Sequence, residues 1–138
     1  MAALTKERNT PNAKTDYEIV MPVKASTKIY NGAAVCSSAG YAVPAADTAS
    51  LLTMGVAYET ADNSAVAVDG AISVPVRVGC FFFDTTAIVA ADVGKLCYWT
   101  DDHTVDLVGV TAQDIVAGKI MAVDATFGVL VDLRQKVA

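Results

Sequence analysis

The segment AISVPVRVGCFFF, Ala71 to Phe83, combines β-branched and aromatic residues over a longer run than any other part of the chain. Residues of these kinds favour strands, because they fit a pleated surface that packs on both faces. Pro75 removes a backbone donor and predicts an edge position or a bulge, and Gly79 predicts a bend. The segment therefore predicts the longest strand of an all-β protein.

Upstream of this segment the pattern also favours strands. Apolar side chains alternate with others over Tyr17–Val23 and over Met54–Thr60, which ends at a turn predicted for Asp62-Asn63-Ser64. Ala33–Pro44 predicts a hairpin, in which Gly40 takes the positive φ that such a turn requires. The first half of the chain thus predicts short antiparallel strands.

Downstream the spacing stays short. Ala87–Lys95 predicts a single helical turn ended by Gly94. Four further strands are predicted, over Lys95–Thr100, Thr104–Val110, Ile115–Ala125 and Phe127–Arg134, with turns at Asp101-Asp102 and at Asp124-Ala125-Thr126. Many short strands at such intervals predict a small all-β barrel or sandwich with at most one short helix.

Composition narrows the class of protein. The 138 residues suit one domain, and 54% of them are apolar, mostly small Ala and Val. No run is long and apolar enough for a membrane span, and no secretory signal is present, so we expect a soluble protein made in a cytoplasm, without a membrane partner. The chain has a net charge of −5, and its acidic side chains concentrate after residue 28. An acidic body repels phosphate backbones, so we expect no nucleic-acid partner.

The N-terminal stretch LTKERNTPNAK, Leu4 to Lys14, differs from the rest of the chain. It contains three basic residues, two Asn, two Thr and one Pro, and almost no apolar side chain that a core could bury. We therefore predict two parts: an extended N-terminal arm over residues 1–16, which its own domain does not bury, and a β-barrel-like body over residues 17–138.

The residues that could carry chemistry are few. Cys36, Cys80 and Cys97 are odd in number and lie in apolar runs, so we expect reduced, buried thiols. The single histidine, His103, follows Asp101-Asp102 at a predicted turn, where we expect solvated charges and no metal site. A Cys97–His103 nucleophile pair is disfavoured, because burial raises a thiol pKa. We predict no cofactor and no enzymatic activity.

Two surface hypotheses remain. The triplet Phe81-Phe82-Phe83 must place rings on both sides of a strand, so that either both sides are covered or one side is a possible interface. A second function class is a small carbohydrate-binding or cell-surface module that uses Tyr98 and Trp99.

The order of these segments resembles that of the capsid decoration, or cement, proteins of tailed bacteriophages. The likeness spans almost the whole chain. It includes Arg8-Asn9-Thr10-Pro11 before the first strand, Gly55-Val56-Ala57 through Asp62-Asn63-Ser64, Val93-Gly94-Lys95 through Thr104-Val105, and the closing strand GVLVDLR. The run CFFF departs from the family pattern, because it is more aromatic.

The resemblance implies a β-tulip-like body on the outer surface of the virion capsid, synthesised in the host cytoplasm. Its partner would be the major capsid protein, and it would stabilise an expanded head by bridging neighbouring copies. The resemblance also implies a homo-oligomer, a trimer or alternatively a dimer. The arm would grip the capsid by β-augmentation. Its candidate contact residues are Thr5, Lys6, Arg8, Asn9, Thr10 and Pro11.

Overall fold

A computed structural model describes residues 2–134, and for residues 12–16 it describes the backbone alone. The prediction of a small all-β domain is confirmed. The strands are β1 (Asn12–Pro22), β2 (Thr27–Ile29), β3 (Ala34–Ser38), β4 (Tyr41–Pro44), β5 (Leu52–Ala57), β6 (Ala61–Asn63), β7 (Ser73–Phe83), β8 (Leu96–Trp99), β9 (Val105–Asp106), β10 (Val116–Asp124) and β11 (Gly128–Asp132). One 3-10 turn, η1 (Ala90–Asp92), is the helical turn predicted within Ala87–Lys95.

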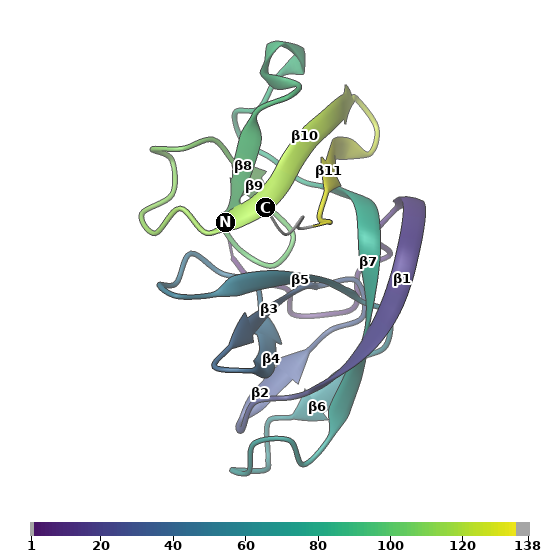
Figure 1. Ribbon diagram of the computed structural model, residues 1–138, viewed down its shortest axis with the longest axis vertical. Coiled ribbons are helices and arrows are strands. Elements are labelled where there is room, and N and C mark those ends of the chain that lie inside the picture. Colours follow the sequence, from purple (N-terminus) through teal and green to yellow (C-terminus); the bar gives the residue numbers. More distant parts are fainter. Residues whose placement is uncertain (1, 135–138) are drawn as a thin grey trace.

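Strand β7 organises the molecule. One side of it pairs with β1 along nearly its whole length, and the other side pairs first with β5 and then with β11. From β5 the main sheet continues through β3 to β4, and from β11 it continues through β10 and β8 to β9. Figure 1 shows the two branches as the lower and upper halves of the molecule, with β1 at the outer edge beside β7.

The sheet curls into a half-barrel. In the lower half, Val23 follows β1 directly and bridges to Ala42 of β4, so the two ends of that branch meet. In the upper half, Asp84 follows β7 directly and bridges to Thr104, just before β9. The short strands β2 and β6 form a separate two-stranded sheet.

The structure has two core clusters, of which the upper one also takes residues from β3 and β5 of the lower branch, such as Cys36 and Val56. The upper core contains Trp99, Phe81 and Phe83, all buried, together with aliphatic residues of β10 and β11. The rings of Phe83 and Trp99 meet edge to face, with centroids 4.9 Å apart. The lower core contains smaller side chains such as Val35 and Val74. Because β7 contributes to both cores, it fixes the two halves relative to each other.

The prediction for β7 was correct in extent, but neither alternative that Pro75 predicted, an edge position or a bulge, is found at Pro75. Its 11 residues equal β1 in length, but it is a central strand and not an edge strand. Pro75 is tolerated because its carbonyl accepts a hydrogen bond from the Tyr58 backbone N–H at 3.2 Å, one residue beyond the end of β5. Pro75 has no backbone N–H to donate, but it lies just beyond the last β5–β7 pair, Ala57 with Val76, so no ladder hydrogen bond is lost there.

The first strand begins earlier than predicted. β1 starts at Asn12 and not at Tyr17, and its ladder with β7 runs from Asn12 opposite Phe81 to Pro22 opposite Ser73. The ladder is irregular between Thr15 and Tyr17. A polar sequence can form this strand because backbone groups alone make its hydrogen bonds. The backbone of residues 12–16, which the sequence analysis assigned to the arm, therefore belongs to β1.

Local turn signals gave mixed results. The hairpin of β3 and β4 is confirmed, with Ala39 and Gly40 at φ of 51° and 90°. The strand predicted over Thr104–Val110 is limited to β9. The turn predicted at Asp62-Asn63-Ser64 is wrong for Asn63, which is buried in β6 and donates through Nδ2 to the carbonyls of Val23, Lys24 and Val68. A short-range pattern could not reveal these long-range acceptors.

Candidate functional site

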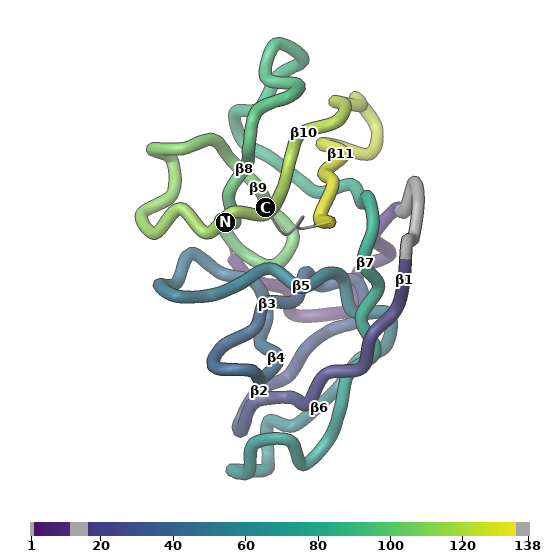
Figure 2. The backbone as a smooth tube through the Cα atoms, viewed as in Figure 1, coloured from purple at the N-terminus to yellow at the C-terminus, as the bar shows by residue number. Residues whose placement is uncertain are grey.

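The N-terminal arm, residues 2–11, lies against its own body. Figure 2 shows this first part of the chain crossing the middle of the molecule, between the halves that contain β10 and β3. This differs from the expectation of an arm that its own domain does not bury. The contacts are mostly polar, which explains why an apolar pattern did not reveal them.

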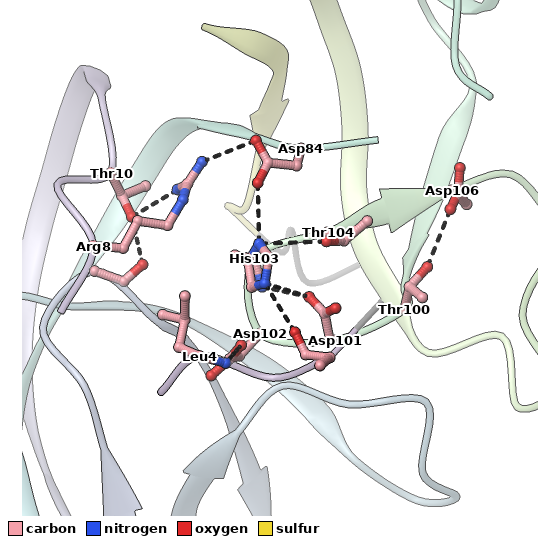
Figure 3. Close-up of polar contacts among 12 residues, drawn as sticks. Leu4, Arg8, Thr10, Asp84, Thr100, Asp101, Asp102, His103, Thr104 and Asp106 are labelled. Carbon is pink, nitrogen blue, oxygen red and sulfur yellow. Dashed lines mark hydrogen bonds and ion pairs between the residues drawn. The ribbon is translucent and has the colours of Figure 1, made fainter. Parts of the chain in front are cut away.

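Arg8 is the main anchor of the arm. Its backbone N–H donates to the carbonyl of Asn31 at 2.8 Å. Its guanidinium donates to Thr10 Oγ1 at 2.8 Å and to the carbonyl of Phe82 at 3.3 Å, and it forms an ion pair with Asp84 at 3.5 Å (Figure 3). The side chain is 17% exposed, so these charge-assisted bonds are largely shielded from solvent.

Gly32 makes room for the arm. It adopts a φ of +90°, and the Thr10 hydroxyl donates to its carbonyl. A Cβ atom placed on Gly32 would lie 1.7 Å from the carbonyl oxygen of Arg8. The arm can therefore reach this position only because residue 32 is glycine. The Asn31-Gly32 pair is a turn signal that could have marked this site, although nothing local showed what would pack there.

A second anchor lies at the loop between β8 and β9. Asp102 accepts a hydrogen bond from the Leu4 backbone N–H at 3.0 Å, and His103 Nε2 lies 3.1 Å from the carbonyl oxygen of Ala2. On its other side, His103 Nδ1 lies 3.0 Å from Asp84 Oδ2 (Figure 3). Asp84 therefore contacts both Arg8 and His103 and connects the two anchors.

The charges of this loop are not solvated, contrary to the sequence-based expectation. Asp101 and Asp102 are 5% and 2% exposed, and His103 is partly buried. Burial raises the pKa of Asp102, while the hydrogen bond from Leu4 and the nearby His103 oppose that shift. Polar residues in a sequence indicate a turn, but the arm that covers them is about a hundred positions away.

The six candidate arm residues divide into two groups. Arg8, Thr10 and Pro11 are partly buried against the body, and the Pro11 carbonyl accepts the Phe82 backbone N–H at 3.0 Å. Thr5, Lys6 and Asn9 are exposed. The second group is therefore free to contact a partner while the arm stays in place.

A polar cleft opens beside the arm. It has a volume of about 470 Å³ and lies between arm residues that include Glu7 and Asn9 and body residues that include Tyr58 and Arg77. The Arg77 guanidinium lies over the Tyr58 ring at 4.5 Å, and Arg77 Nε is 3.9 Å from Glu18. The cleft therefore contains charges of both signs.

The aromatic triplet is mostly core. Phe81 and Phe83 are 1% and 0% exposed, so the prediction that they belong to a possible interface is wrong. They share the inward face of β7, as alternation in a strand requires. Phe82 alone points outward, and its ring lies 5.5 Å from that of Phe127, which is 50% exposed. An outer aromatic surface therefore consists of Phe82 and Phe127.

The residues proposed for glycan binding and for thiol chemistry are also buried or partly buried. Trp99 is fully buried and donates through Nε1 to Thr53 at 2.8 Å, so it cannot stack on a sugar, while Tyr98 is half-buried. The side chains of Cys36, Cys80 and Cys97 are buried. Burial raises the pKa of Cys36 and of Cys97 to about 12, which removes thiolate nucleophilicity at neutral pH.

Comparisons of the chain with protein-family models, with curated proteins and with solved structures returned no match. The described part of the chain contains no helix with the length and hydropathy of a membrane span. The fold and the site thus define a small all-β domain whose N-terminal arm is held on its surface by two polar anchors.

Proposed function

We propose that the chain is a capsid decoration protein of a tailed bacteriophage, which binds the outer surface of an expanded head and bridges neighbouring major capsid proteins. The observation that supports this most directly is the arm. It has no regular secondary structure, it is attached mainly by polar contacts, with the Leu4 side chain packed against the lower core, and it presents Thr5, Lys6 and Asn9 to solvent. Such a segment can exchange its contacts with the body for contacts with another protein at low cost.

Strand β1 adds a second surface of the right kind. It pairs with β7 and with no other strand among the described residues, and its outer face carries Val20, which is 71% exposed. Tyr17, which is 53% exposed, lies on the opposite face, which it shares with the buried Met21. An edge strand next to such an arm can accept an extended partner strand. The arm and β1 would together contact two neighbouring capsid subunits.

A symmetric oligomer, a trimer or alternatively a dimer, would multiply these contacts. Each copy then needs only modest affinity, because repeated attachment raises the effective concentration of every further contact. The carbohydrate-binding alternative is weaker, since Trp99 is not accessible.

The test uses undecorated, expanded heads of the phage whose genome encodes the chain. Full-length protein and a variant lacking residues 2–11 are mixed with the heads, sedimented and quantified in the pellet. We expect saturable binding by the full chain and a strong loss for the truncated chain, which keeps all of β1. A triple variant, Thr5→Ala with Lys6→Ala and Asn9→Ala, should lose binding while its melting temperature stays unchanged.

The matched control is Ser64→Ala, an exposed polar substitution beyond β6 and distant in sequence from the arm. Failure of the full-length chain to sediment with the heads would refute the proposed function. Equal binding by the full-length and truncated chains would instead place the grip on the body.

A further inference from the structure

We propose that Asp101, Asp102 and His103, together with the carbonyl oxygen of Ala2, bind a divalent transition-metal cation of the zinc class. This inference is independent of the proposed function and reverses the sequence-based expectation of no metal site at this turn. It rests on the geometry, burial and charge of the loop between β8 and β9.

The ligand atoms are already close together. One atom each from Asp101, Asp102 and His103 lies within 4.8 Å of the other two. His103 Nε2 is 3.5 Å from Asp101 Oδ1 and 3.1 Å from the Ala2 carbonyl oxygen. Zinc bonds of about 2.0–2.2 Å in a tetrahedron separate ligand atoms by roughly 3.4 Å. These two distances already match that value. Asp102 would become a ligand by exchanging the hydrogen bond that it accepts from the Leu4 backbone N–H for the cation.

The hydrogen bond on the far side of His103 supports a ligand role for Nε2. Nδ1 lies 3.0 Å from Asp84 Oδ2, and when Nδ1 carries the hydrogen that Asp84 accepts, Nε2 presents a lone pair. That lone pair then faces Asp101 Oδ1, as Figure 3 shows, and it also faces the Ala2 carbonyl oxygen. In that tautomer a bound cation would satisfy the three acceptors together. A carboxylate that orients a histidine in this way is typical of metal sites.

A buried, unpartnered oxygen is an independent sign of a missing ligand. Asp101 Oδ2 is fully buried and has no hydrogen-bond partner, and the Asp101 side chain is 7% exposed. An unpaired carboxylate oxygen in such a position is costly, and a bound cation would satisfy it. The Asp101 carboxylate is directed at His103, as Figure 3 shows.

The charges around the site favour a divalent cation. Asp84, Asp101 and Asp102 supply three carboxylates, and Arg8 is the cation that contacts them through Asp84. A divalent ion would supply the two positive charges that these four described side chains lack. The mixed imidazole and carboxylate set favours zinc-class ions over Ca²⁺ or Mg²⁺, which prefer oxygen ligands alone.

The test uses untagged full-length protein that has been treated with EDTA and dialysed. Co²⁺ serves as a spectroscopic probe and Zn²⁺ as a competitor. Because His103 is the only histidine of the chain, any imidazole–cobalt signal has one possible source. We expect one Co²⁺ per chain, a visible absorption band that Zn²⁺ abolishes, and a higher melting temperature with either ion.

The variants His103→Gln and Asp102→Asn should each weaken Co²⁺ binding at least tenfold, while Asp62→Asn, an exposed carboxylate on β6, should not change it. If a variant fails to fold, a second readout on the wild type remains: metal should slow tryptic cleavage after Lys6 and Arg8, because Ala2 is a ligand. The absence of a cobalt band at millimolar Co²⁺ would overturn the proposal. Stability that changes with pH through His103 and does not change with added metal would also overturn the proposal, because a proton and not a metal ion would then be the cation at this site.

Discussion

Replacing Gly32 by alanine should release the arm while the body stays folded. The new Cβ would lie 1.7 Å from the Arg8 carbonyl oxygen and 2.9 Å from Thr10 Oγ1. The nearest atom belongs to the backbone, so no side-chain rotation can relieve the clash. The arm must therefore leave its site. Apart from the backbone strain at residue 32, the loss in the free energy of unfolding cannot exceed the free energy of arm docking, because undocking relieves the clash.

That free energy follows from the contacts that the arm would lose. An alanine at a left-handed φ costs about 1–2 kcal/mol by itself. Undocking removes the hydrogen bonds of Arg8 to Asn31 and Phe82, each with a net value of about 0.5–1.5 kcal/mol. The Asp84 ion pair is long and half-exposed on the acid side, so it adds little. The arm-specific loss should therefore be about 1–3 kcal/mol.

Gly40→Ala is the matched control. Gly40 has the same φ of +90°, but a Cβ there meets nothing within 4 Å. Both variants carry the same backbone strain, so the difference between their free energies of unfolding in urea measures arm docking. The second assay is limited trypsin digestion, in which cleavage after Arg8 should accelerate roughly 5- to 150-fold in Gly32→Ala. Equal stability and equal cleavage in the two variants would refute the docked arm.

Three further outcomes test the core, the thiols and the helical turn. In urea melts, Phe83→Ala should destabilise the fold by about 3–5 kcal/mol, because Phe83 is fully buried. Phe82→Ala, on the outer face, should cost about 1 kcal/mol. Equal losses in the two variants would contradict the assigned faces. Cys36 should react with a disulfide reagent at pH 8 only after unfolding, because burial raises its pKa to about 12, and rapid labelling of native protein would count against this. The hydrogen bond from the Val89 backbone N–H lowers the pKa of Asp92 in the folded protein. The stability that this bond gives is therefore present above the unfolded pKa of 3.8, and it is lost as the pH falls through the lower, folded pKa. Asp92→Asn should therefore lower the urea midpoint at pH 7 and not at the lowest pH. A difference between the urea midpoints of wild type and variant that stays the same at every pH would contradict this role of Asp92.

The part of the fold that depends on local signals could be predicted from the sequence. Two short apolar runs around the Gly40 turn were enough for the β3–β4 hairpin, and the β-branched run was enough for β7. Position within the sheet was not predictable, because Pro75 signals an edge and only the early end of β5 explains its central place. Backbone pairing of a polar strand gives no apolar period, so the start of β1 at Asn12 left no pattern.

The candidate site was predictable only in its arm residues. Arg8 could be identified as the best charged donor, but its partners Asn31, Phe82 and Asp84 lie 23 to 76 positions away, and no short-range rule connects them. The burial of Asp101 and Asp102 depends on the same distant arm. Long-range polar contacts of this kind require coordinates.

The β1–β7 ladder decides how the domain would respond to force on its N-terminus. Its nine register pairs run from Asn12 to Pro22, and their hydrogen bonds lie perpendicular to the strands. A pull directed along β1 would therefore load these pairs together in shear instead of peeling them one at a time. The weaker polar anchors at Arg8 and Leu4 would release first and provide about ten residues of slack, roughly 33 Å of extended chain, before any strain reached the two cores. Attached through its arm, the domain would behave as a tether with a yielding first segment and a stiff second one.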